Sequence, residues 1–241
     1  MKLNKLTVIV GSTCLSLLLI GSAFASNAFN TSPAKAEIIS SSFDDLKAKI
    51  EQEKRSKSLA ADVPLVRGKD FQISKQDFIF YKSGMEMINK LQNNNSLKSS
   101  SFSDDSLIDD MVTKELTVSY AKELGLKVTP QEVDTVIQQE RSYLNDPSIT
   151  GELEGGIDNN ETVREIMKHN IRITGLSEDE FWNRDQTKQG YEKALLLGKL
   201  YDKLAAEGEI EKDGAAFENY KKNLFENSKG EVIVDKSVLN N

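Results

Sequence analysis

The chain has 241 residues, of which 38% are apolar and 29% charged, and its net charge is −7. This acidic balance argues against nucleic acid and anionic membrane surfaces as partners, because both attract basic patches. The low apolar fraction predicts a modest core with well-exposed helices, in a chain short enough to form one domain.

Residues 1–25 have the pattern of a secretory signal peptide. Lys2 and Lys5 give a positive start, a long apolar stretch follows, and Ala23 and Ala25 form a small-x-small site of the kind that signal peptidase cuts. We therefore expect an exported, extracytoplasmic protein. Cleavage would remove two lysines and no acid, and would lower the net charge to −9.

Two alternatives stay open at this end of the chain. A second small-x-small site, Ala34 and Ala36, would move the cut to residue 36. Retention of the apolar stretch would instead leave a membrane anchor, since its length approaches the ~20 residues that span a bilayer. Cys14 is the single cysteine, so cleavage leaves a chain without disulfides.

The mature chain is expected to begin with a flexible leader, residues 26–42, which is rich in Ser, Asn and Ala. A single domain, residues 43–241, follows it. Phe43, Leu46 and Ile50 recur at helical spacing and predict a helix that ends near residue 59.

Short β-rich runs on both sides of Gly68 predict a small hairpin over residues 63–73. Ser74 and Asp77 then form a capping-box pattern, which predicts a helix that reaches the polar stretch beginning at Asn93.

The most regular helical pattern runs from Ser103 to the stop at Gly125. Thr129, Pro130 and Glu132 start another helix only a few residues later, with an N-cap, a proline at the first helical position and an acid at N3. A turn this short predicts that the two helices pack against each other as a helical hairpin.

The last third of the chain is also predominantly helical. After a glycine-rich loop over 145–160, a short helix ends before Gly175. The Ser177–Glu180 capping pattern then opens the longest helix, which is expected to run unbroken to Gly208. A last short helix follows, and residues 232–234 are a candidate strand that would join the early hairpin. The fold class is mainly α with a small hairpin.

This order of elements resembles the N-terminal domain of the exported SurA and PrsA foldase chaperones. Three segments carry the likeness: PLVRGKDFQISKQDF at 64–78, LIDDMVTKELTVSYAKELGLKVTPQEVDTVI at 107–137, and GLSEDEFWN at 175–183. Together with the helices between and after them they cover residues 43 to about 225. The resemblance implies a SurA N-terminal-like domain that binds unfolded or extended segments of exported proteins.

The sequence departs from those foldases in its chemistry. The parvulin prolyl-isomerase domain that follows in the family has no counterpart before Asn241, and its site needs histidines together with a Cys or Asp. His169 is the sole histidine, and we interpret it as a solvated residue near a helix C-terminus. No metal, nucleotide or cofactor motif occurs, so we expect a protein that is not an enzyme.

Large, adaptable apolar side chains are the candidates for peptide binding. These are Tyr81, Met85, Met87, Phe181 and Trp182. Tyr81, Met85 and Phe181 lie on the periodic faces of their helices, which also favours the core. Met87 and Trp182 lie off those faces and are expected to be exposed.

The functional hypothesis is therefore an exported, non-catalytic, chaperone-like protein. Its expected partners are unfolded or exported proteins, with a membrane as partner only if the N-terminal segment is retained. The alternative is a structural or regulatory adaptor of the cell envelope with one dedicated protein partner. A prolyl isomerase is the least favoured of the three, and the sequence leaves the oligomeric state open.

Overall fold

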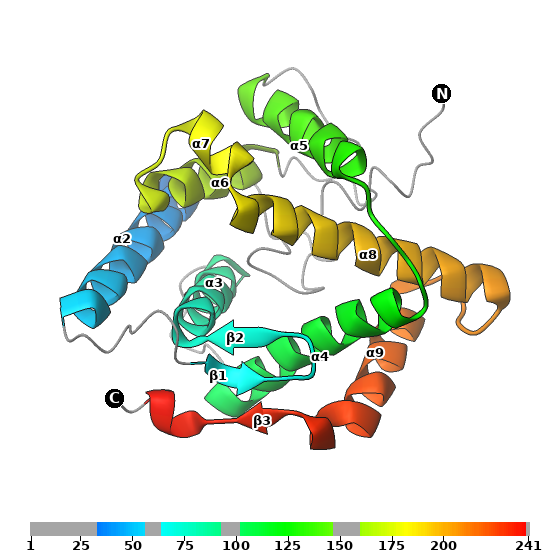
Figure 1. Ribbon diagram of the computed structural model, residues 1–241. Coiled ribbons are helices and arrows are strands. Elements are labelled where there is room, and N and C mark those ends of the chain that lie inside the picture. Colours follow the sequence, from blue (N-terminus) through cyan, green and yellow to red (C-terminus); the bar gives the residue numbers. More distant parts are fainter. Residues whose placement is uncertain (1–32, 56–63, 93–101, 147–159, 240–241) are drawn as a thin grey trace.

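The computed structural model describes residues 33–55, 64–92, 102–146 and 160–239 (Figure 1). Helices dominate, as predicted, and a small antiparallel sheet accompanies them. In chain order the elements are α2 (Pro33–Arg55), β1 (Pro64–Arg67), β2 (Gln72–Ser74), α3 (Lys75–Gln92), α4 (Asp104–Glu123), α5 (Pro130–Asn145), α6 (Asn160–Thr174), α7 (Glu178–Asn183), α8 (Asp185–Glu207), α9 (Gly214–Ser228), η1 (Lys229–Glu231), β3 (Ile233–Val234) and η2 (Lys236–Leu239).

Helix α2 starts earlier than the sequence pattern predicted. The expected flexible leader is wrong from Pro33 onward, because residues 33–42 form the first turns of this helix. Ile38 and Ile39 are buried there and extend the apolar stripe of Phe43. Burial of that stripe against α3 and α6 supports a helix that few local signals indicate. Residues 26–32 lie outside the described residues.

The sheet is three-stranded and has the order β2-β1-β3. The predicted hairpin is present as β1 and β2, with Val66 opposite Ile73. The predicted C-terminal strand is present as well: β3 pairs antiparallel with β1, with Val234 opposite Val66. The Asp235 N–H donates to the Leu65 carbonyl at 2.8 Å. An isolated two-stranded hairpin is marginally stable, so this third strand completes a more stable unit.

Side-chain caps fix the starts of several helices where the sequence predicted them. The Ser74 N–H donates to Asp77 Oδ2 at 2.9 Å, and the Asp77 N–H donates to Ser74 Oγ at 3.0 Å. Reciprocal capping boxes also join Thr129 to Glu132 at α5, and Ser177 to Glu180 at α7. These bonds satisfy backbone N–H groups that the helices leave unpaired.

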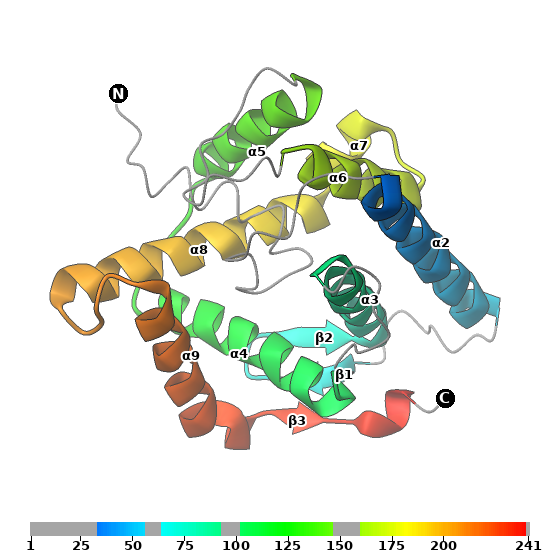
Figure 2. The same cartoon turned by 180° about the vertical axis from the view of Figure 1, so that it is seen from behind.

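The prediction that α4 and α5 pack against each other is wrong. Each of them packs on α8 instead, and they lie apart on two sides of it (Figures 1 and 2). The connection turns at Leu124 and Gly125 and then runs without regular secondary structure to Thr129, and it carries the chain from one side of α8 to the other (Figure 1). Leu126 and Val128 are partly buried along it and pack against the core cluster that includes Leu196 and Leu200 of α8.

The long helix expected after Ser177 is interrupted at Arg184. This residue has an extended conformation (φ −69°, ψ 148°), which ends α7 and begins α8. Arg184 Nε donates to Thr187 Oγ1 at 2.8 Å, across the junction. The change of direction lets α7 pack against α6 while α8 continues along α4 and α5.

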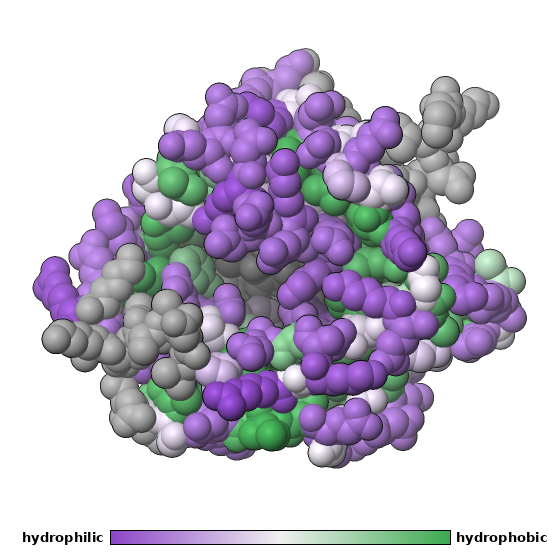
Figure 3. Space-filling model, in the orientation of Figure 1, coloured by the Kyte–Doolittle hydropathy of each residue, from purple (hydrophilic) through white to green (hydrophobic). Residues whose placement is uncertain are grey.

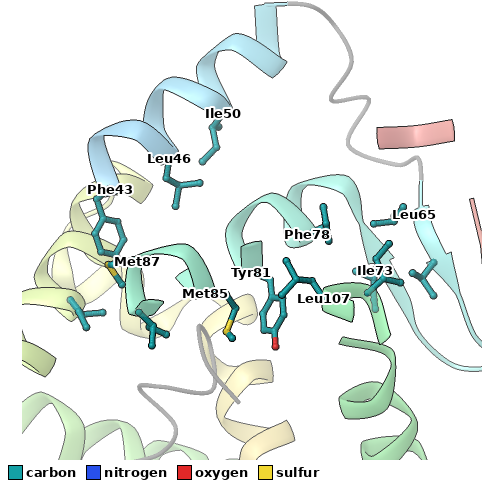
Figure 4. Close-up of a cluster of buried hydrophobic side chains, with 14 of the residues drawn as sticks. Phe43, Leu46, Ile50, Leu65, Ile73, Phe78, Tyr81, Met85, Met87 and Leu107 are labelled. Atoms are coloured by element: carbon teal, nitrogen blue, oxygen red, sulfur yellow. The ribbon is translucent and has the colours of Figure 1, made fainter. Parts of the chain in front are cut away.

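Three apolar clusters form the core of the described residues. The largest joins α2, the sheet, α3 and the first half of α4, and includes Val238 from η2 (Figure 4). The second lies between α5, α6, α7 and the first half of α8, around Trp182 and Tyr191. The third joins the second halves of α4 and α8 to Phe217 and Tyr220 of α9. Within the described ranges, no helix is both long and apolar enough to cross a bilayer.

Candidate functional site

A cleft of about 580 Å³ opens between two walls of the molecule. One wall is formed by β2, α3 and α4, and the other by α6, α7 and the first half of α8. In the space-filling view the same face of the molecule is hollowed near its middle and rimmed mainly by hydrophilic side chains (Figure 3). The size is that of pockets that hold small molecules or short peptide segments.

Side-chain amides are frequent along both walls. They come from Gln72, Gln76, Asn170, Gln186 and Gln189. None of these amides makes a hydrogen bond with another residue of the described ranges. Each amide offers both donors and acceptors, which are the groups that an extended polypeptide backbone requires.

Apolar side chains lie between the amides. Phe80, Met111 and Ile173 are partly exposed, and Leu197 extends the apolar surface along α8. Tyr81 and Phe181 contribute from opposite walls. Met and aromatic groups adapt to varied shapes, so the cleft combines hydrogen-bonding amides with adaptable apolar side chains.

Two of the acidic groups in the cleft already have partners. Glu115 of α4 accepts a charged hydrogen bond from Lys193 of α8, at 2.5 Å. Asp77 is held at the start of α3 by Ser74, whose Oγ donates to it at 2.7 Å. The Glu115–Lys193 pair joins one wall to the other, and both carboxylates are therefore compensated.

Two basic groups in the cleft have no carboxylate within ion-pair distance in the described part of the chain. The Lys114 ammonium lies 4.9 Å from the ring centre of Tyr81, and Arg184 Cζ lies 4.5 Å from that of Phe181. Cation–π contacts of this length hold each cation against its wall.

The surroundings of these cations alter their ionisation. Burial lowers the pKa of the Lys114 ammonium to about 8, and the nearby Lys221 adds to that shift. Burial also lowers the pKa of the Arg184 guanidinium, which stays charged at neutral pH. On the same wall as Lys114, burial raises the pKa of the Tyr81 phenol, so Tyr81 stays neutral.

The structure separates the five predicted peptide-binding residues into two groups. Tyr81 and Phe181 line the cleft, although most of their surface is buried. Met85, Met87 and Trp182 are buried in the core and do not line it. Core positions were expected for Tyr81, Met85 and Phe181 from the helix period, and all three are buried.

The predicted exposure of Met87 and Trp182 is wrong. Met87 is only 2% exposed, because α3 lies between α2 and α4 and is covered on two sides (Figure 4). Trp182 is 1% exposed: its ring packs edge-on against Phe181 and its Nε1 donates to Glu178 at 3.3 Å. Burial on more than one face removes the polar side that a surface helix shows.

His169 also lies in a different environment from the predicted one. It is within α6 rather than at its end, and its ring stacks on Phe43 at 5.4 Å between centroids. Burial lowers the pKa of its imidazole, with Arg172 adding to the effect. No group of three or more His, Cys, Asp or Glu side chains is placed to hold a metal ion in the residues that the structure describes.

Of the two predicted cleavage sites, only the second lies within the described residues. Ala23 and Ala25 lie outside the described residues. Ala34 and Ala36 lie in the first turn of α2, directly before the buried Ile38. A cut at residue 36 would therefore shorten α2 next to its packed face.

The amide and cation lining was missed by sequence reasoning. Glutamines such as Gln72 and Gln189 are ordinary on exposed helices and strands, so neither spacing nor composition distinguishes those that face a cleft. Lys114 and Arg184 share no motif, and only the tertiary packing of α4 against α8 brings them into one site. Comparison with known proteins gives no match to a family model, a curated protein or a solved structure.

Proposed function

We propose that this protein is an exported, non-catalytic, chaperone-like protein that binds unfolded or extended segments of other exported proteins in the cleft between α3–α4 and α6–α8. The observation that carries the proposal is the lining of that cleft. Side-chain amides that make no hydrogen bond with other described residues lie there beside partly exposed aromatic and aliphatic groups.

Such a lining suits a ligand whose sequence varies. Amides bind the peptide backbone, which every polypeptide shares, and Met111 and Phe80 accept apolar side chains of different shape. A site that selects one small molecule instead needs a few converging polar groups in an enclosed pocket.

Two sequence features support the same proposal. The signal-peptide pattern of residues 1–25 supports export to the compartment in which exported chains fold. The resemblance of residues 64–78, 107–137 and 175–183 to SurA and PrsA supports an unfolded or extended polypeptide as the ligand. A protein that holds clients without changing their covalent structure needs no catalytic group.

The proposal is tested by measuring whether the protein suppresses the aggregation of denatured proteins, and whether it still does so when its cleft is blocked. Purified protein without residues 1–25 is mixed with two unrelated denatured proteins, and light scattering follows their aggregation. We expect the wild type to slow aggregation of both. Gln189→Trp places a large ring in the cleft and should abolish most of this effect, because bound segments and the indole compete for the same space.

Gln138→Trp is the matched control, since Gln138 is exposed on α5 and does not line the cleft. It should retain full activity. Equal suppression by both variants would place binding outside the cleft. Failure of the wild type to slow either aggregation, together with tight binding of one native envelope protein, would favour the dedicated adaptor instead.

A further inference from the structure

The charges of the cleft are not balanced by its own residues. Glu115 is paired with Lys193, and Asp77 is held by Ser74 in the cap of α3. Lys114 and Arg184 remain without a carboxylate within ion-pair distance among the described residues. The chain as a whole carries a net charge of −7, so this local excess of positive charge runs against its overall composition.

Both cations are fixed rather than free to move into solvent. Each lies over an aromatic ring, Lys114 over Tyr81 and Arg184 over Phe181. Arg184 is further held by its Nε, which donates to Thr187 Oγ1 at 2.8 Å. Its two Nη groups keep their N–H donors, in the fork geometry that matches a carboxylate.

Asp110, Glu115 and Glu218 act on Lys114 from a distance, but no described carboxylate forms an ion pair with either cation. A partly buried cation without such a direct partner is costly, and an incoming anion in contact with it reduces that cost. The desolvation cost of Lys114 and Arg184 is offset only when an anionic ligand is bound. These two groups therefore add to the affinity for the ligand rather than to the stability of the protein with an empty cleft. The aromatic rings beside the cations would at the same time contact an apolar side chain next to the anion.

We propose that the cleft selects extended polypeptide segments that carry a carboxylate beside apolar residues, with the carboxylate bound by Lys114 and Arg184. This inference rests on the proposed function, since it specifies which segments the cleft prefers. Two sources supply the same chemistry, the side chain of an internal Asp or Glu and the carboxylate at the end of a chain.

The test uses synthetic peptides with a neutral fluorophore, followed by fluorescence anisotropy at low salt. The first peptide, GSFELEFSG with an amidated end, is compared with its isostere GSFQLQFSG. We expect the glutamate peptide to bind wild-type protein at least about tenfold more tightly, as charge-assisted hydrogen bonds commonly allow. The glutamine peptide with a free carboxyl end tests the second source. If it binds more tightly than the same peptide with an amidated end, Lys114 and Arg184 bind the carboxylate at the end of a chain.

Lys114→Met and Arg184→Met remove the charges and keep long side chains over the rings. Each should bring the glutamate and glutamine peptides close to equal affinity. Lys47→Met, on the exposed side of α2, is the control and should keep the preference. The comparison of peptides on the wild type needs no variant, so it stands even if one variant folds poorly.

Three results would overturn the proposal. Equal, measurable binding of all the peptides to the wild type would leave a peptide-binding cleft without selection for carboxylates. A carboxylate preference that persists in both folded variants would place the anion elsewhere. Absence of binding by every peptide, together with failure to slow aggregation, would overturn the proposed function itself.

Discussion

The two largest apolar clusters are assembled in different ways. The cluster around Trp182 uses segments between residues 128 and 195, so neighbouring helices supply nearly all of it. The cluster around the sheet joins Ile38 near the start of the described chain to Val238 near its end. The first depends on local capping and short connections, whereas the second is complete only when distant segments meet. We therefore expect the two clusters to be destabilised by different changes: the first by loss of a central side chain, and the second by loss of the C-terminal segment.

Truncation of the central side chain should have the largest effect. Trp182→Ala removes a side chain that is 1% exposed and contacts both Phe181 and Tyr191, so it leaves a large cavity. We expect a loss of about 3–5 kcal/mol in the free energy of unfolding, as for other buried aromatics. Urea denaturation followed by far-UV circular dichroism measures it, because the variant lacks the only tryptophan. Trp182→Phe is the control and should recover part of the loss; a change below about 1 kcal/mol in the alanine variant would show that the cluster is not close-packed.

Removal of the returning chain tests the other cluster. Deletion of residues 230–241 takes away β3 and the buried Val238, and should lower the melting temperature by several degrees, corresponding to about 2–3 kcal/mol. Differential scanning calorimetry measures the shift. Ile233→Ser is the control, since this side chain is 69% exposed and its backbone pairing is kept. An unchanged melting temperature after the deletion would mean that helices alone support the hairpin.

A buried carboxyl group gives the Trp182 region a pH dependence. Glu140 of α5 is 2% exposed, and burial raises the pKa of its carboxyl group to about 8. The folded protein therefore holds this proton over the pH range in which the unfolded chain, with an ordinary pKa near 4.5, has lost it. Stability from this group is greatest below pH 4.5 and is lost as the pH rises toward 8.

Glu140→Gln removes this titration and keeps the size of the side chain. We expect the variant to be more stable than the wild type at pH 8, by on the order of 2 kcal/mol, and the difference to shrink as the pH falls to 5. Thermal melts of both proteins between pH 5 and 8 provide the comparison, and the difference between them cancels the titration of other groups. A difference that does not vary with pH would show that Glu140 is ionised in the folded protein.

Local signals made much of this fold predictable. The starts of α3, α5 and α7 follow from Ser74, Thr129 and Ser177, because capping depends on residues only three positions apart. The hairpin follows from β-rich runs around Gly68, and the third strand from the branched residues 232–234 near the C-terminus.

The errors arise where packing partners are distant in sequence. Residues 33–42 carry weak helical signals, and only contact with α3 and α6 holds them in α2. The link before Thr129 is short enough for a hairpin, yet α8, far along the chain, lies between the helices that it joins. The same limit applies to the cleft: Tyr81 and Phe181 were among the candidates, but Lys114 and Arg184 meet them only through tertiary contacts.

The pairing of β1 with β3 has a consequence for the order in which the chain becomes available during synthesis. Val66 leaves the ribosome long before its partner Val234, by roughly ten seconds or more at ordinary elongation rates. Throughout that interval the β1 edge of the hairpin lacks its partner strand, and the core beneath it lacks Val238. The nascent chain therefore completes this core only after its C-terminal segment has been synthesised.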